Sequence, residues 1–277
     1  MSAIGASALL TLASTSHAQG SPLDQMLAEE PDGNTLVTPS FVVPDRPLER
    51  GTSSTPTHLG VKLSVAADWH IYWQNNGSSG APPSFEWSAP DGVEIGAPRW
   101  PVPERKLLFG GEAVDYVYHG APVLLFPVTV DPSFEGEFAE ISLSVSWLVC
   151  KSVCLFGEGE IDVTVPVADP APRTTVISDE LADIMDTMPR RTLPADVSLV
   201  RRGAIVAVRA PGAESLAFLP HRHEQITMSN ESKSGAAEGE TLRFLLDGPP
   251  GALEEFSGVL VIERGGDRRG YRVDSMP

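Results

Sequence analysis

The two cysteines of this 277-residue chain, Cys150 and Cys154, are separated by three residues and follow an alternating apolar run. Two cysteines can form a disulfide only when their Cα atoms lie within about 7 Å of each other. A continuous strand would hold positions 150 and 154 about 13 Å apart, because each residue of a strand adds about 3.3 Å. The chain must therefore turn between the two cysteines if their thiols are to pair.

Such a disulfide would close a very short loop, and loop-closure entropy then contributes only about 2 kcal/mol, against about 3 for a fifteen-residue loop. That is a weak staple for a chain of this length, whereas two close thiols are what thiol–disulfide exchange requires. Lys151 lies between the cysteines and could stabilise a thiolate. Spacing alone leaves a structural staple, a redox pair and a metal site open.

Composition narrows the class of protein. The net charge of −17 argues against a nucleic-acid-binding surface, which needs clustered Lys and Arg. Apolar residues make up 42% of the chain, and it contains 25 glycines and 25 prolines, as in a turn-rich β protein. Haem-attachment, zinc-site and phosphate-loop motifs are absent from the sequence, so we expect no cofactor and no resident metal. His221 and His223 are interpreted as part of a surface loop.

The amino terminus has the form of a secretory signal. An apolar stretch over residues 3–13 is followed by Ser16-His17-Ala18, a small-x-Ala cleavage pattern. We therefore expect residues 1–18 to be a signal peptide and residues 19–37 to be a flexible leader. Secretion would place the cysteines in an oxidising compartment, where a disulfide persists.

Alternating apolar residues predict the domains. Residues 59–65, 141–147 and 161–165 alternate as half-buried strands do, and further strand signals recur about every 8 to 12 residues. The pattern predicts an all-β chain with a β-sandwich over residues 38–168 and a second, smaller β-sandwich over residues 193–277. Between them, residues 169–192 are expected to form a linker with a short helix.

Four motifs accompany the cysteines: Trp147-Leu148-Val149-Cys150-Lys151 with Cys154 and Gly157, Trp69-His70 with Tyr72-Trp73, Trp100-Pro101 with Pro103-Glu104-Arg105, and Tyr116 with Tyr118 and Gly120. Together they resemble the amino-terminal periplasmic region of the DsbD-type thiol:disulfide interchange proteins. The likeness is closest to the branch associated with suppression of copper sensitivity. It is strong over the first predicted domain and weak over the second.

This resemblance implies an immunoglobulin-like β-sandwich in the periplasm, with a redox pair at one end of a hairpin. It implies electron transfer from a membrane-embedded disulfide reductase domain to periplasmic thioredoxin-like or disulfide-isomerase-like proteins, in processes such as cytochrome c biogenesis and copper tolerance. Family members continue into a membrane domain and a thioredoxin-like domain, so we expect the electron donor to be on another chain. The likeness also suggests Cys154 as the attacking thiol.

The resemblance further implies an aromatic cap over the redox pair. The matching segment contains Leu108, Phe109 and Gly110, so Phe109 is the candidate cap, and the glycine would let the loop move. The alternative for Phe109 is a plain core aromatic. Tyr72 and His70 are expected to flank the site, with a packed aromatic and a hydrogen-bonded core histidine as the alternatives.

Three functions follow from these observations. The first is a periplasmic thiol–disulfide exchange module. The second is a copper-binding or copper-tolerance protein whose two thiols hold Cu(I), which soft sulfur ligands favour. The third is a structural interaction sandwich with an inert disulfide.

Overall fold

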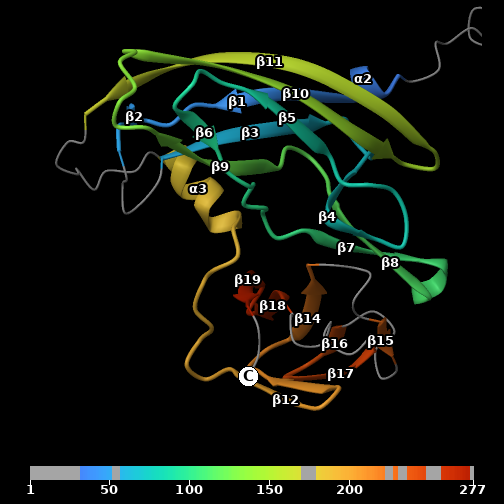
Figure 1. The fold of residues 1–277 in the computed structure, drawn as a ribbon. Helices are drawn as coiled ribbons and strands as arrows, with labels where there is room; N and C mark the ends of the chain where they lie inside the picture. Colours follow the sequence, from blue (N-terminus) through green and yellow to red (C-terminus); the bar gives the residue numbers. More distant parts are fainter. Residues whose placement is uncertain are drawn as a thin grey trace, which may run out of the picture. The chain divides into compact units, whose positions relative to one another are not determined.

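The computed structural model describes residues 32–51, 57–169, 179–221, 227–229, 236–247 and 257–274. Strands dominate these residues (Figure 1), which confirms the prediction of an all-β fold. No helix in these ranges is both long and apolar enough to cross a bilayer. The expected signal peptide, the leader up to residue 31 and His223 lie outside the described residues.

Two four-stranded sheets form the first β-sandwich, with strand orders β1–β3–β9–β6 and β2–β11–β10–β5. Neighbouring strands are antiparallel, except that the short β2 runs parallel to β11. The bounds are β1 Val37–Val42, β2 Leu48–Glu49, β3 Thr57–Val65, β5 Ser84–Ser88, β6 Val93–Ile95, β9 Val123–Val130, β10 Phe138–Cys150 and β11 Cys154–Ala168.

Strand β10 shows how the sequence pattern builds the core. Ile141, Leu143, Val145 and Trp147 are at most 2% exposed, and the serines between them face outward. Successive side chains of a strand point to opposite faces, so the alternation places every apolar residue of this run on one side. That side belongs to the same apolar cluster as residues of β3 and β9, which lie in the facing sheet.

A third sheet carries most of the aromatic residues near the cysteines. Its order is β4–β8–β7, with bounds β4 Ile71–Gly77, β7 Glu104–Leu108 and β8 Ala113–Tyr118. Tyr72, Trp73, Tyr116 and Tyr118 are at most 5% exposed. Strand β4 is bulged between Tyr72 and Gly77. This sheet brings bulky side chains from three separate segments of the chain close to the end of β10.

The end of the predicted leader is ordered in the structure. Helix α2 spans Gly33–Leu36 and β1 starts at Val37, so the folded region begins before the predicted boundary at residue 38. The reason is that hydrogen bonds hold helix α2 against the β10–β11 hairpin. The Trp147 indole N–H donates to Gly33 O at 3.1 Å, and the Glu158 N–H donates to the Asn34 side chain at 2.8 Å.

A single described helix, α3 (Asp179–Thr187), follows the first sandwich, where the sequence predicted a short helix. Ile184 and Met188, one turn apart, are buried and pack with Leu125 of β9. This contact fixes the end of the helix against the first sandwich.

The remaining strands form two more four-stranded sheets, β12–β13–β17–β15 and β16–β14–β18–β19. Their apolar cluster includes Phe218 and Phe244, whose rings stack with centroids 5.2 Å apart. The bounds are β12 Ser198–Arg202, β13 Ile205–Arg209, β14 Ser215–Pro220, β15 Thr227–Ser229, β16 Ala236–Glu238, β17 Thr241–Asp247, β18 Gly258–Arg264 and β19 Asp267–Val273.

The strands before and after α3 share side-chain contacts within the compact unit Asp32–Pro277. Val259 and Val261 of β18 belong to the same apolar cluster as Trp73 and Tyr116. The buried Asn75 side chain donates to Pro220 O at 2.7 Å. The division into two domains at residues 169–192 stays a prediction.

We expect Trp147→Phe to lower the free energy of unfolding by about 2 kcal/mol, because it removes a buried hydrogen bond and part of a buried ring. Urea denaturation followed by circular dichroism measures the change. Ser144→Ala on the outer face of β10 is the matched control and should stay within about 0.5 kcal/mol of the parent. Equal stability of Trp147→Phe and the control would show that the hydrogen bond from Trp147 to Gly33 contributes nothing to the free energy of unfolding.

Candidate active site

The two cysteines form a disulfide at the tip of the longest hairpin. Cys150 ends β10, Cys154 begins β11, and they are directly opposed across the hairpin with a Cα–Cα distance of 4.2 Å. Residues 151–153 make the turn, in which the Lys151 N–H donates to Val153 O at 3.0 Å. The predicted turn between the cysteines is thus confirmed, and the antiparallel register brings the two sulfurs together.

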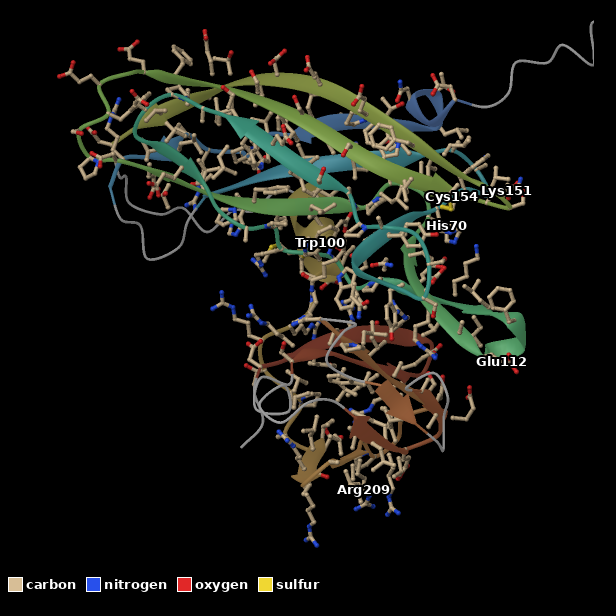
Figure 2. All side chains as sticks on the ribbon, turned by 45° about the vertical axis from the view of Figure 1, so that its right-hand side comes forward. His70, Trp100, Glu112, Lys151, Cys154 and Arg209 are labelled. Carbon is tan, nitrogen blue, oxygen red and sulfur yellow. A yellow bond between two sulfur atoms is a disulfide. The ribbon has the colours of Figure 1, made fainter. Side chains whose placement is uncertain are left out.

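The two sulfurs differ in their surroundings. Cys150 is 3% exposed, and its backbone exchanges two hydrogen bonds with His70, of 3.0 and 2.9 Å. Cys154 is exposed (Figure 2). An incoming thiolate can therefore reach Cys154, whereas Cys150 is held behind it by the backbone of β10.

Tyr72, one of the two residues expected to flank the site, lies beside the exposed sulfur. Its Oη is 4.0 Å from Cys154 Sγ, at the limit of a hydrogen bond to sulfur. Burial raises the pKa of Tyr72 above its ordinary value of 10.0, so the phenol is neutral and can donate near neutral pH. Gly80 packs directly on the Tyr72 ring, and a Cβ at that position would collide with it.

Asp115 holds the loop at residues 78–80, which packs on Tyr72 through Gly80, by hydrogen bonds. The sequence analysis did not identify Asp115. This carboxylate of β8 is 1% exposed and accepts from the Ser78 N–H, the Ser79 N–H and the Ser79 hydroxyl, at 3.0, 2.8 and 2.5 Å. Buried carboxylates are stable only when hydrogen bonds replace their hydration. Asp115 therefore positions Tyr72 through the loop at residues 78–80.

His70 is the second predicted flanking residue, and it is 2% exposed. Lys106 Nζ, from β7, lies 3.4 Å from His70 Nδ1 and 3.3 Å from Nε2. Burial, followed by the charges of Lys106 and His119, lowers the pKa of His70 from 6.5 to about 4. His70 is therefore neutral at physiological pH, and the cation next to it is Lys106, which the sequence analysis did not identify.

Lys151 lies in the turn between the cysteines and is half exposed. Its Nζ is 3.1 Å from Asp68 Oδ2, and both side chains face solvent. Exposed ion pairs of this kind contribute little to stability. The Asp68 carboxylate nevertheless offsets part of the positive charge that Lys151 brings to the disulfide turn.

The predicted cap segment forms the turn between β7 and β8. Leu108 ends β7, and Phe109 and Gly110 follow in the 3-10 turn η1 (Phe109–Gly111). Phe109 is 81% exposed, so the alternative of a core aromatic is wrong. In this structure the ring does not cover Cys154, which is itself exposed. Its role as a movable cap stays a prediction, and Gly110, with φ 69°, supplies a backbone that few other residues adopt.

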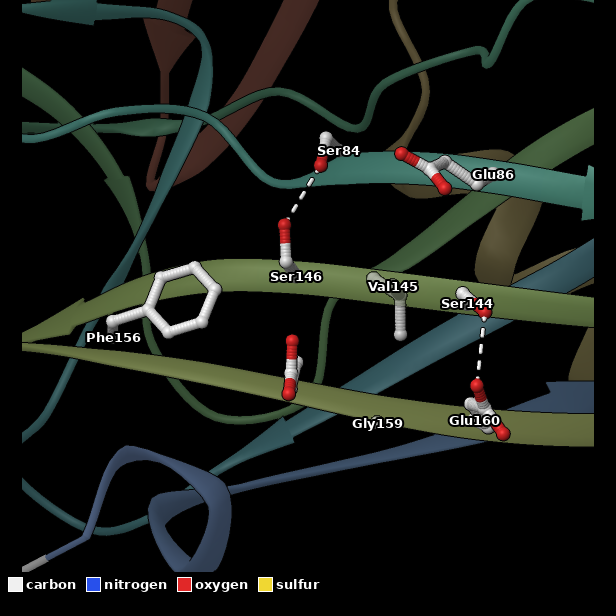
Figure 3. Close-up of a pocket in the computed structure, with 9 residues that line it drawn as sticks. Ser84, Glu86, Ser144, Val145, Ser146, Phe156, Gly159 and Glu160 are labelled. Atoms are coloured by element: carbon white, nitrogen blue, oxygen red, sulfur yellow. Dashed lines mark hydrogen bonds between the residues drawn. The ribbon is translucent and has the colours of Figure 1, made fainter.

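A groove of about 360 Å³ runs along the outer face of β5, β10 and β11 (Figure 3). Serines and carboxylates line it, with hydrogen bonds from Ser84 to Ser146 at 2.7 Å and from Ser144 to Glu160 at 3.3 Å. Phe156, two residues beyond Cys154, forms one end and is 61% exposed. The groove thus combines an exposed aromatic ring with serines and carboxylates.

The described residues contain no group of three or more His, Cys, Asp or Glu side chains arranged to hold a metal ion. The two bonded sulfurs are the soft ligands at this site. The arrangement of an exposed Cys154 sulfur next to a neutral phenol is suited to thiol–disulfide exchange.

Comparison with known proteins gives the family context. Residues 38–166 match the family model described as thiol:disulfide interchange protein DsbD, N-terminal. No curated protein sequence matches the chain. The structure is similar to the N-terminal periplasmic domain of ScsB from Proteus mirabilis, at 14% identity over 87% of this chain and 94% of that one, with a TM-score of 0.54. That likeness shows a shared fold.

A second similar structure is the DsbD N-terminal domain from Neisseria meningitidis in its reduced form. It is 18% identical over 48% of this chain and 87% of that one, with a TM-score of 0.31.

We expect Lys106→Gln to raise the pKa of His70 from about 4, because it removes a cation that disfavours imidazolium. The rise should stop short of 6.5, since burial, the larger cause, remains. Titration of the histidine ring protons by NMR measures it, with Lys62→Gln on β3 as the control. An unchanged or lower pKa of His70 would contradict the placement of Lys106.

We expect Asp115→Asn to lower the free energy of unfolding by about 2–3 kcal/mol, because an amide cannot accept all the hydrogen bonds that the buried carboxylate accepts. Denaturant unfolding measures it, with the exposed Asp162→Asn of β11 as the control. A loss no larger than in the control would mean that the loop at residues 78–80 is held by other contacts.

Proposed function

Residues 38–166 belong to the amino-terminal domain family of the DsbD thiol:disulfide interchange proteins, and we propose on this basis that the chain is a thiol–disulfide exchange module acting through Cys150 and Cys154. The observation that carries the proposal is the asymmetry of the disulfide, in which an exposed Cys154 is bonded to a buried Cys150. An inert staple has no need of an exposed sulfur beside a phenol and near lysines.

The exchange runs in two balanced steps. In the reduced domain, the Cys154 thiolate attacks a partner disulfide, an S–S bond forms between the two proteins, and one partner sulfur leaves as a thiolate. The Cys150 thiolate then attacks Cys154 Sγ, which re-forms the intramolecular disulfide and releases the second partner sulfur. Two electrons pass to the partner, whose two sulfurs take up protons from solvent or from neighbouring groups.

The residues around Cys154 support this assignment of roles. When a donor thiolate attacks the exposed Cys154 sulfur, a mixed disulfide forms and Cys150 leaves as a thiolate. The donor's second thiolate then attacks the donor sulfur of that mixed disulfide and releases Cys154 as a thiolate, to which the neutral Tyr72 phenol at 4.0 Å is placed to donate a hydrogen bond. The charge of Lys151, in the turn between the cysteines, favours the thiolate, although the ion pair with Asp68 offsets part of this effect. Cys150, shielded by its backbone pairing with His70, serves as the resolving thiol.

We place the protein in the periplasm, with a membrane-embedded disulfide reductase domain as electron donor and thioredoxin-like or disulfide-isomerase-like proteins as acceptors. The family supports this, because its members are interchange proteins. The ScsB domain of similar fold is described as periplasmic. A persistent disulfide is also typical of oxidising compartments.

Copper binding by the same two thiols is the alternative function. It is tested by titrating the reduced protein with Cu(I), and stoichiometric uptake in competition with a chelator would support it. The exchange proposal instead requires that the disulfide equilibrates with the thiols of a partner protein.

We expect Cys150→Ala to trap partner proteins in mixed disulfides through Cys154, because the resolving thiol is missing. Cys154→Ala should trap far less, since Cys150 is buried. The measurement is non-reducing electrophoresis and mass spectrometry of each variant after mixing with an oxidised thioredoxin-like protein.

The double variant Cys150→Ala/Cys154→Ala is the control and should form no mixed disulfide. Equal trapping by the two single variants would contradict the proposed roles. A reduction potential of the wild-type pair below about −300 mV would identify an inert disulfide instead of an exchange site.

A further inference from the structure

A second concave site lies on the described part of the chain, apart from the disulfide. It has a volume of about 350 Å³ and is lined by residues of β4, of the segment before β7, of the segment after α3, and of β18 and β19. None of the residues assigned to the exchange site lines it. The volume falls at the lower end of the range for small-molecule sites.

Three guanidinium groups meet at this pocket, those of Arg99, Arg191 and Arg272. Such a cluster is unusual in a chain that has 37 acidic and 20 basic residues and a net charge of −17. Among the lining residues of the pocket there is no Asp or Glu. Burial, and then the charges of Arg191 and Arg272, lower the pKa of Arg99, so the guanidiniums repel one another when the pocket is empty.

One of the three charges is partly neutralised. Arg272 Nε donates to Asp274 Oδ1 at 2.7 Å, in an exposed pair on the last described turn of the chain. The lining histidine, His221, has a lowered pKa because of burial and the charge of Arg272. It is therefore neutral at physiological pH and its ring can accept or donate one hydrogen bond. The pocket thus keeps a net positive charge.

Polar donors stand beside the guanidiniums. Trp73 forms part of the wall and is 1% exposed, and its buried indole N–H has no hydrogen-bond acceptor among the described residues. A buried donor left without an acceptor is costly, and native proteins rarely keep one. His221 lies 5.8 Å from the Trp73 ring, and its Nδ1 is 3.2 Å from the Ser257 hydroxyl. Trp100 gives the pocket a second indole.

We propose that this pocket binds a small molecule that carries a carboxylate or phosphate group, with the oxyanion held by Arg99, Arg191 and Arg272. Guanidinium groups bind such oxyanions through paired N–H donors, and a bound anion would relieve the mutual repulsion of the three arginines. The indole walls fit a planar or apolar remainder of the ligand. The site is independent of exchange at the cysteines, and its loss leaves the proposed function untouched.

The experiment uses the full chain and two probes, inorganic phosphate and benzoate, in isothermal titration calorimetry at low ionic strength. We expect saturable binding of at least one probe, and a rise in melting temperature with its concentration. Arg99→Gln and Arg191→Gln should each weaken binding at least tenfold. Tighter binding of benzoate would identify an organic carboxylate as the ligand class, and tighter binding of phosphate would identify a phosphate group.

Arg209→Gln is the matched control, because Arg209 is exposed on β13 and does not line the pocket (Figure 2). It should bind the probes as the parent does. Circular dichroism and the melting temperature without probe establish that each variant is folded. The absence of saturable binding of both probes up to about 10 mM, or equal weakening by Arg209→Gln and Arg99→Gln, would overturn the proposal.

Discussion

The register of the β10–β11 hairpin is the constraint on which the site depends. The two strands pair continuously from Phe138 opposite Pro166 to Cys150 opposite Cys154. Side chains directly opposed on antiparallel strands share one face, so this register alone brings the sulfurs into bonding range. A slip by one residue would also turn the apolar face of β10 toward solvent. The burial of Ile141, Leu143 and Val145 therefore fixes the position of a disulfide that lies several residues away.

The tip of this hairpin is held from two sides. On one side, Trp147 and Glu158 donate hydrogen bonds to Gly33 and Asn34 of helix α2. These bonds hold the two strands close to the cysteines. On the other side, His70 pairs with the backbone of Cys150. Both contacts are made with the hairpin, and neither covers the sulfur of Cys154. Rigid support of the buried cysteine thus coexists with access to the exposed one.

The period of the apolar residues was enough to predict the long strands, because burial on one face imposes a strict alternation on residues such as those between 141 and 147. The turn at the cysteines was also predictable, since a disulfide over that spacing admits no straight strand. Lys106 and Asp115 were not predictable in the same way. Each acts on the site through a partner in a distant segment of the chain, His70 for Lys106 and Ser79 for Asp115, and such pairings depend on how the sheet is arranged. The sole local signal for Asp115 was a charge among the apolar residues of β8. Strand β19 has no such signal in the sequence, because its first half is charged and exposed, without apolar alternation.

The electrostatics of the site follow from which groups are kept neutral. His70 and Tyr72 carry the ring systems nearest the disulfide, and burial keeps both uncharged near neutral pH. Charges of both signs lie around these rings: Lys106 is next to His70, the Asp115 carboxylate acts on Tyr72, and Lys151 in the turn is paired with Asp68. A hydrogen bond from the neutral Tyr72 phenol favours a thiolate over a thiol at Cys154, and a thiolate must form whenever the Cys150–Cys154 bond is broken. The acidic groove beside the hairpin begins only beyond Phe156, so its carboxylates lie along the face of the sheet and not at the sulfurs.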